Sequence, residues 1–492
     1  MIHIKYEDLT LFEQARKMSL QNLMKRTETK NFLVHLASLA RKMHDQDVSL
    51  IRVRVDNSAI QPIVAIWDIH YLAYYAIKHR DWVDHRYKYL GRNLDCTLVS
   101  AANKHQNRNY LSDNKEVLPY ITGLFLEQSL FQKANLINSS IHRTNYILTR
   151  TNGLDINNIL NSSVNCDLGE YWRAIIFIYL VCKNEESPFK NYYGSEREKG
   201  LIEMNPMFGF NRLKPIIAEI SCSYKEVAKS QLKYQIFYEK PLINIDNSYV
   251  CINPQLVMFL FNSLLYRLCF KHCYHFSNIF GNMFESYVGE VIGSSACSFK
   301  KINHDGKRAD FVVWIGNTTI LVEVKTALLE IGIKSYYPDL SRYYTYIEKI
   351  VAKAYKQIKA SIKKEFTLKE QSNVLKIILA YDESSVYTDI KKVVASVSHL
   401  PKIFNNDETP RILDEFINDD HAIFATIGEF ETLMAISEDQ KVFDSVIEAL
   451  LSNNCNCQLV SIFAQLNIEY TPYLGIDNNF LNELLKNMIN KV

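Results

Sequence analysis

Three charged residues interrupt the apolar segment "RADFVVWIGNTTILVEVKTA", residues 308–327. Asp310 stands before one apolar run, while Glu323 and Lys325 close the next one. Two carboxylates and an amine are a set that can hold a divalent cation and act on a bound water. These three residues can do this chemistry only if the fold brings their side chains together.

The dipeptide Gly316-Asn317 predicts a two-residue hairpin turn between two strands. Such a turn fixes the register, and this register places Asp310 directly across from Glu323. Because side chains two residues apart on a strand share a face, Lys325 projects on the same side as Glu323. The hairpin thus predicts one cluster of all three side chains.

Apolar residues fill both faces of this hairpin, which is typical of strands covered by helices on both sides. One face carries Phe311, Val313, Ile320 and Val322, and the other carries Val312, Trp314 and Leu321. Two opposed carboxylates would destabilise such a strand pair, and burial would increase the cost. We therefore expect a cation to neutralise them. Mg²⁺ is the expected ion, with Mn²⁺ as a substitute, because one or two carboxylates plus phosphate oxygens and water suffice to hold Mg²⁺.

A helix is predicted before the hairpin, starting at a cap formed by Ser277 or Asn278 and ending near Gly293. Helical spacing puts Glu285 on the edge of its apolar face, from where it can approach the sheet. Glu290 points almost the opposite way and is expected to meet water.

The order of these elements resembles the PD-(D/E)xK phosphodiesterase superfamily, the restriction endonuclease-like nucleases. Asp310 followed by "EVK" at 323–325 matches the family motif, with Ala309 where the motif has proline. A helix, three strands, a long helix from about 341 to 364 and the strand "VLKIILAY" follow the family's αβββαβ order over roughly 277–381. The segment "HAIFATIG" at 421–428 adds a later strand.

The resemblance implies an α/β fold class, with a restriction endonuclease-like αβββαβ core in the C-terminal half. Apolar residues at helical spacing before it predict a mainly α-helical N-terminal domain. We expect a helical domain over 1–240 that binds substrate or a partner, a nuclease-like domain over 241–445, and a helical C-terminal extension over 446–492 packed on it.

The resemblance also implies Mg²⁺-dependent hydrolysis of phosphodiester bonds, in DNA in preference to RNA. Asp310 and Glu323 would hold the metal, and Glu285 would complete its shell directly or through water. Lys325 would orient or deprotonate the attacking water, or stabilise charge on the phosphate. Gln357 on the long helix matches a residue that many family members place near the site.

The long helix also carries a stripe of lysines on one side. Its members are Lys349, Lys353, Lys356, Lys359 and Lys363. The stripe is either a nucleic-acid-binding surface that grips phosphates or a plain solvated helix face.

Composition bounds the remaining expectations. A chain of 492 residues exceeds one ordinary core, and 56 basic against 54 acidic residues leave any nucleic-acid affinity to local patches. The best membrane candidate, 256–270, is too short and too polar to span a bilayer, so no membrane partner is expected. Ten scattered cysteines favour a reduced, cytoplasmic protein.

Three alternatives stay open at this stage. The domain is an active DNA nuclease, an RNA-directed nuclease, or an inactive module that binds nucleic acid or protein. A role in bacterial restriction or phage defence is a further hypothesis, and the assembly is open between a homodimer and a defence-system partner protein.

Overall fold

A computed structural model describes the following parts of the chain: 2–5, 9–25, 27–56, 62–79, 94–111, 137–150, 154–185, 187–245, 248–302, 308–326, 345–366, 374–381, 391, 394–395, 404, 406–455 and 458–469. The described residues form two compact units. One holds the residues up to 111 together with 155–273, and the other holds those between 137 and 154 together with 274–469.

The first unit is mainly helical and contains two small sheets. Its helices are α1 (Leu9–Lys17), α2 (Leu20–Lys25), α3 (Thr29–Asp45), α4 (Ile66–Lys78), α5 (Leu94–Leu111), α8 (Ile156–Val164), α9 (Leu168–Asn184), α10 (Glu196–Met204), α11 (Phe210–Glu219), α12 (Tyr224–Lys229), α13 (Ile236–Glu239) and α14 (Pro254–His272). Its strands are β1 (Ile2–Ile4), β2 (Leu50–Val55), β3 (Ile63–Ala65), β4 (Ser221–Ser223), β5 (Leu242–Ile245) and β6 (Ser248–Cys251).

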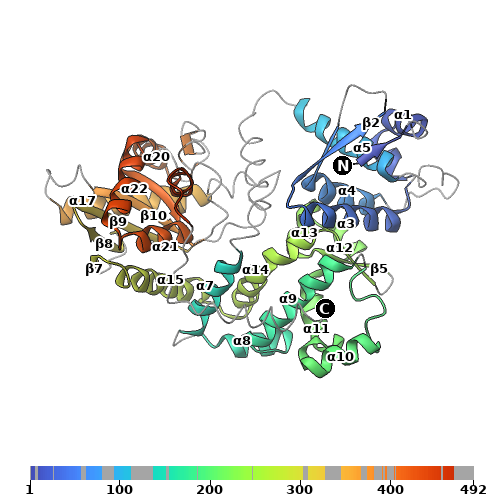
Figure 1. Ribbon diagram of the computed structural model, residues 1–492, viewed down its shortest axis with the longest axis horizontal. Helices are drawn as coiled ribbons and strands as arrows, with labels where there is room; N and C mark the ends of the chain where they lie inside the picture. The colour runs from blue at the N-terminus through green and yellow to red at the C-terminus, as the bar shows by residue number, and fades with distance from the viewer. Residues whose placement is uncertain are drawn as a thin grey trace. The chain divides into compact units, whose positions relative to one another are not determined.

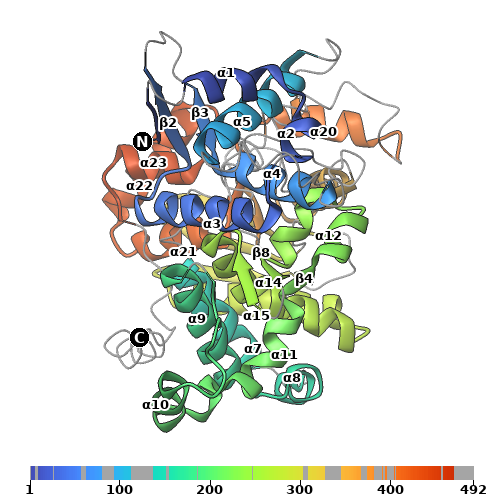
Figure 2. The same ribbon diagram turned by 90° about the vertical axis from the view of Figure 1, so that its right-hand side faces the viewer.

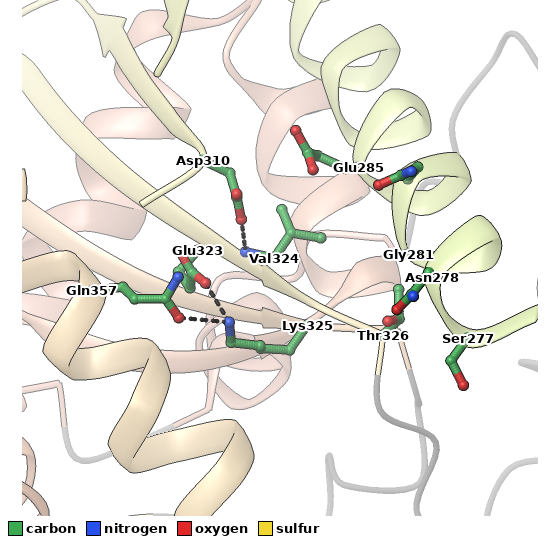
Figure 3. Close-up of a pocket in the computed structure, with 11 residues that line it drawn as sticks. Ser277, Asn278, Gly281, Glu285, Asp310, Glu323, Val324, Lys325, Thr326 and Gln357 are labelled. Atoms are coloured by element: carbon green, nitrogen blue, oxygen red, sulfur yellow. Dashed lines mark hydrogen bonds and ion pairs between the residues drawn. The ribbon is translucent and has the colours of Figure 1, made fainter. Parts of the chain in front are cut away.

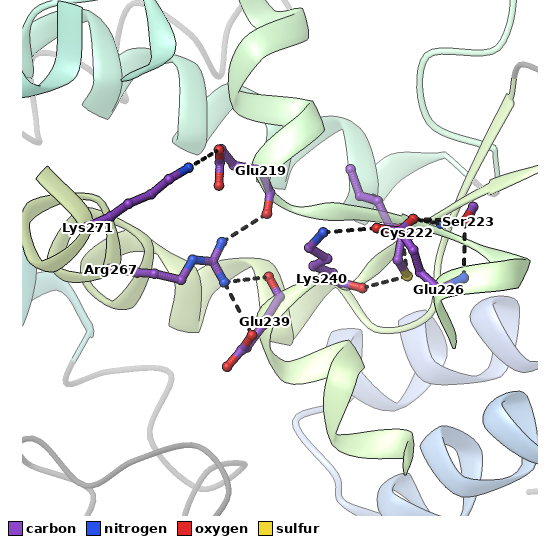
Figure 4. A network of polar contacts seen from close by, with 9 residues as sticks. Glu219, Cys222, Ser223, Glu226, Glu239, Lys240, Arg267 and Lys271 are labelled. Atoms are coloured by element: carbon purple, nitrogen blue, oxygen red, sulfur yellow. Dashed lines mark hydrogen bonds and ion pairs between the residues drawn. The ribbon is translucent and has the colours of Figure 1, made fainter. Parts of the chain in front are cut away.

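The predicted domain boundary near residue 240 is corrected by this structure to a position between Cys273 and Tyr274. Strand β5 pairs in parallel with β4, which ties the chain after residue 240 to the first unit. Arg267 on α14 donates to the carbonyl oxygens of Glu219 (2.9 Å) and Glu239 (3.5 Å), so it caps the last turns of α11 and α13 (Figure 4). These bonds make α14 part of the first unit.

Helix α14 contains residues 256–270, the best membrane candidate in the sequence. Most of its apolar side chains are buried in the core of the first unit, with Leu260 and Leu264 fully covered, while Phe270 near its end is exposed. Across the described parts of the chain, no helix combines the length and the apolar character needed to cross a bilayer.

The second unit is an α/β structure built on a mixed five-stranded sheet. The strands are β7 (Ser298–Lys301), β8 (Phe311–Ile315), β9 (Thr318–Lys325), β10 (Val374–Ala380) and β11 (Ala422–Thr426), in the order β11-β10-β9-β8-β7. The helices are α7 (Ile137–Thr149), α15 (Phe276–Gly293), α17 (Lys353–Glu365), α20 (Thr409–Ile417), α21 (Ile427–Ile436), α22 (Gln440–Ser452) and α23 (Leu459–Gln465), and a π-helical turn, Glu348–Ala352, leads into α17.

Helices cover this sheet on both faces. β7, β8 and β9 run antiparallel to one another, and β10 and β11 continue the sheet in parallel with β9. α15 and α21 pack on one face and α17 with α20 on the other, as Figure 1 shows. The central strands are mainly apolar for this reason, since helices cover both of their faces. Trp314 departs from the prediction of a buried hairpin, being 37% exposed beside the exposed edge strand β7.

The predicted hairpin register is confirmed as far as Phe311, which pairs with Val322. Gly316 occupies the turn with φ +55°, and a side chain there would collide with Gln440. At Asp310 the pairing shifts, because its N–H donates to the oxygen of Val322 (3.0 Å) rather than to Glu323. Two residues of one strand then oppose one of the other, as at a β-bulge.

The ends of two predicted elements differ from the structure or fall outside it. α15 begins at Phe276 after an N-cap, His275, that makes no side-chain cap bond, so Ser277 and Asn278 lie inside the first turn. The predicted start of the long helix at 341–344 and the end of the C-terminal extension, 470–492, lie outside the described residues. Within that extension, α22 starts before residue 446 and packs on α21, which makes it part of the unit.

A buried ion pair fastens α7 to this unit. Arg143 donates to both carboxylate oxygens of Glu431 on α21, from Nε at 2.6 Å and from Nη2 at 2.9 Å, and both side chains are fully buried. The hydroxyl of Tyr287 on α15 donates to the same carboxylate (2.5 Å). Helix α7, which is far from β9 in the sequence, therefore belongs to the unit that contains β9.

We expect Arg143→Met to lower the free energy of unfolding of this unit by about 3–5 kcal/mol, because the buried Glu431 carboxylate keeps its bond from Tyr287 but loses its counter-charge. The double variant Arg143→Met with Glu431→Leu should be destabilised less, since no charge then stays buried. Urea unfolding followed by amide hydrogen exchange in β9 and β10 measures both. A decrease below about 1 kcal/mol in the single variant would show that α7 is dispensable.

Candidate active site

A pocket of about 350 Å³ opens where α15 faces the ends of β8 and β9. It is lined by Ser277, Asn278, Gly281, Asn282, Glu285, Asp310, Glu323, Val324, Lys325, Thr326 and Gln357 (Figure 3). All five predicted catalytic residues are therefore among its walls. They come from α15, β9, α17 and the residue before β8, which are separated by up to 72 residues between Glu285 and Gln357.

The two carboxylates are buried at the strand ends. Asp310 is 5% exposed, and its Oδ2 accepts from the backbone N–H of Val324 at 2.6 Å. Glu323 is 1% exposed, and its Oε1 contacts the amine of Lys325. The other oxygen of Glu323, Oε2, is buried and accepts no hydrogen bond in the described part of the chain. An open acceptor of this kind is costly unless a ligand satisfies it.

Lys325 is held between two partners. Its amine contacts Glu323 and donates to Oε1 of Gln357 at 2.9 Å. Gln357 is itself buried, and its amide nitrogen reaches the carbonyl oxygen of Arg308 at 3.5 Å. Gln357 thus gives the amine a second fixed partner besides Glu323, which is a positioning role for the residue.

Burial raises the pKa of Glu323 to about 8. The Lys325 ammonium opposes this rise, while the carboxylates of Asp310 and Glu285 add to it. Negative charge is therefore in excess at this point, and at neutral pH the cluster retains a proton. A divalent cation would displace that proton and lower the pKa, since cations bind deprotonated carboxylates.

The residues fit Mg²⁺ through the open Oε2 of Glu323 and the adjoining Asp310 carboxylate. Glu285 lines the same pocket, but its carboxylate pairs with Lys301 on β7 at 2.8 Å. In the described residues, accordingly, no three His, Cys, Asp or Glu side chains are grouped to hold one ion. Two carboxylates remain, which is the number that Mg²⁺ takes when phosphate and water complete its shell.

The predicted lysine stripe divides into two groups. Lys356 pairs with Glu408 at 2.7 Å, and Lys359 pairs with Glu415. Lys349, Lys353 and Lys363 are exposed. Ion pairing to α20 and its cap favours a structural role for the middle of the stripe.

Glu290 makes contacts that the sequence did not predict. It is partly exposed, and it accepts from the hydroxyl of Tyr146 (2.6 Å) and from Arg150 (3.1 Å) on and after α7. It lies away from the pocket lining, as its helical position predicts.

Polar residues of α15 also line the pocket, and the sequence analysis did not predict them. Asn278 precedes Glu285 by seven residues, two helical turns, and so shares its side of the helix. Asn282 and Ser277 flank that line, and Gly281 lies beside Thr326. The seven-residue spacing of Asn278 from Glu285 is the feature of the sequence from which this lining could have been predicted.

Comparisons with models of protein families, with curated proteins and with solved structures find no match to this chain. Its function is therefore inferred from the pocket itself and from the sequence motif.

We expect Mg²⁺ binding to tighten as pH rises from 6 to 9, because proton and cation compete for Glu323, whose pKa is about 8. Below that pKa the affinity should fall by up to about tenfold per pH unit. Calorimetric titration at several pH values measures this, with the exposed Glu448→Gln as a control that keeps the slope. An affinity independent of pH would mean that Glu323 takes no part in binding.

Proposed function

We propose that this protein is a Mg²⁺-dependent nuclease that hydrolyses phosphodiester bonds, with DNA as the expected substrate. The observation that carries the proposal is the buried pair of Asp310 and Glu323, with an open carboxylate oxygen and a fixed amine beside it. A fold has no structural use for such a cluster, because buried carboxylates close to each other destabilise it.

The arrangement of elements supports the same proposal. A helix with Glu285, the antiparallel strands β7, β8 and β9, then α17 and the parallel strand β10 follow the order of the PD-(D/E)xK core. The motif residues stand at the ends of β8 and β9, and Gln357 reaches them from α17. The intact Asp-Glu-Lys set favours an active enzyme over an inactive module.

Each residue then has a part in the chemistry. Bound Mg²⁺ would polarise the scissile phosphate and lower the pKa of a bound water. Asp310 and Glu323 would hold the ion, and the Val324 N–H keeps Asp310 oriented. The Lys325 amine, fixed by Gln357, would orient the attacking water or stabilise the charge that develops on the phosphate. Because Glu285 pairs with Lys301, it would act on the metal through water or after release from that pair.

We expect Asp310→Ala and Glu323→Ala each to abolish cleavage of DNA, because each removes a metal ligand. The assay incubates supercoiled, linear and single-stranded DNA, and RNA, with Mg²⁺ or with chelator. Glu448→Ala, which removes an exposed carboxylate from α22 of the same unit, should cleave at the parental rate. Full activity of both site variants, or cleavage that continues in chelator, would contradict the proposal.

Lys325→Met should separate catalysis from metal binding. Cleavage should fall by on the order of 10² or more, since a positioned charge acts mainly in the transition state. Because the Lys325 ammonium opposes the rise of the Glu323 pKa, metal affinity is compared at the high-pH plateau of each protein, where it should stay the same or tighten slightly. Calorimetry beside the cleavage assay tests both, with the exposed Lys441→Met as the matched control. Parental cleavage by Lys325→Met would reduce the amine to a structural counter-ion.

A further inference from the structure

The sheet β1-β2-β3 of the first unit has one dry face and one exposed face. In β2, Ile51, Val53 and Val55 are buried, whereas the alternate residues Leu50, Arg52 and Arg54 are exposed. β1 follows the same alternation, with His3 and Lys5 outward. Helix α5 packs against β1 and β3, and Figure 2 shows β2 and β3 beside α1 and α5. The outward residues thus form a surface of their own on this unit.

This outer face carries an excess of positive charge. Lys5, Arg52 and Arg54 are exposed, and none of them pairs with a carboxylate in the described part of the chain. The acid at its border, Asp56, pairs with His3 at 2.8 Å. The whole chain is close to neutral, with 56 basic and 54 acidic residues, so three such cations on one small face are a local bias.

The register sets these cations in a row. β1 pairs with β2 in parallel, so Arg54 lies directly across from His3, and Arg52 lies directly across from Ile63 on β3. Arg52 and Arg54 are about 7 Å apart along their strand. Because both guanidinium groups project from the same strand, an anion bound across them would lower their mutual repulsion.

Exposed aliphatic side chains lie near these cations. Val48 is 40% exposed, Leu50 46% and Ile63 43%, which places them among the most exposed large apolar residues of the described chain. Leu50 shares the outer face with the arginines, and Ile63 stands across from Arg52. The face therefore offers guanidinium groups beside apolar surface.

We propose that this outer face (His3, Lys5, Leu50, Arg52, Arg54 and Ile63) binds a strand of nucleic acid. Guanidinium groups bind phosphates through paired hydrogen bonds and stack on bases, and a positively charged sheet face that follows the backbone suits a polyanion. Leu50 and Ile63 would contact sugars and bases between the phosphates. The choice of nucleic acid over an acidic protein rests on the proposed function, and it gives the first unit the task of holding substrate.

The test measures binding of labelled single-stranded DNA, and of the same sequence as a duplex, by fluorescence anisotropy at several salt concentrations. Chelator is present throughout, so that binding is read without cleavage. Arg52→Gln with Arg54→Gln should weaken binding and lower the slope of log affinity against log salt by about 2, close to 1 for each phosphate that the variant no longer neutralises. Because both side chains are exposed, the melting temperature should stay unchanged.

The matched control is Lys225→Gln with Lys229→Gln on α12, which removes the same charge from exposed positions of the same unit. This variant should keep the parental affinity and slope. Equally weakened binding in both variants, unchanged binding in both, or equal displacement of the DNA by polyglutamate would overturn the proposal. Weakened binding in the arginine variant alone supports it even if no protein sample cleaves DNA, which would count against the nuclease function and leave this surface standing.

Discussion

The second unit depends on a carboxylate placed where apolar packing would otherwise be continuous. Glu323 stands in the interior strand β9, is 1% exposed, and has one oxygen on Lys325 and one that accepts no bond in the described residues. Burial makes the charged form costly, which raises the pKa of Glu323 to about 8. A ligand with positive charge would satisfy both the open oxygen and the excess of carboxylates around it.

The elements around this carboxylate hold its neighbours in place. β10 extends the sheet beside β9, and Tyr381 at its end donates its N–H to the Lys325 oxygen at 3.0 Å. The Tyr381 hydroxyl exchanges a hydrogen bond with Thr144 of α7 (2.8 Å), and its ring packs on Phe280 and Phe284 of α15. Through Tyr381, α7 and α15 thus both contact the chain beside Lys325. The Arg143–Glu431 pair stabilises the same region, so a segment from the N-terminal half supports the geometry of the pocket.

The sequence predicted the local parts of this arrangement well. The turn at Gly316 and the register of β8 and β9 follow from spacing and turn chemistry, which act over a few residues. The place of Gln357 near the site was implied by the family resemblance. The long-range parts escaped it. Nothing local marks Arg143 as the partner of Glu431, 288 residues away, or Lys301 as the partner of Glu285. The boundary predicted near residue 240 is wrong because β5, which follows it, pairs with β4, which precedes it. The alternation of arginines with aliphatic residues in "LIRVRV" indicates a strand, but the prediction of a mainly helical domain overlooked it.

The most direct test of the metal site is an anomalous difference map from a crystal soaked in Mn²⁺. We expect one strong peak in the pocket, about 2.0–2.2 Å from an oxygen of Asp310 and from Oε2 of Glu323, with Lys325 still held by Gln357. No peak there at saturating Mn²⁺ and pH 9, with the Glu323–Lys325 pair unchanged, would show that the carboxylates form a structural ion-pair cluster and would contradict the metal site.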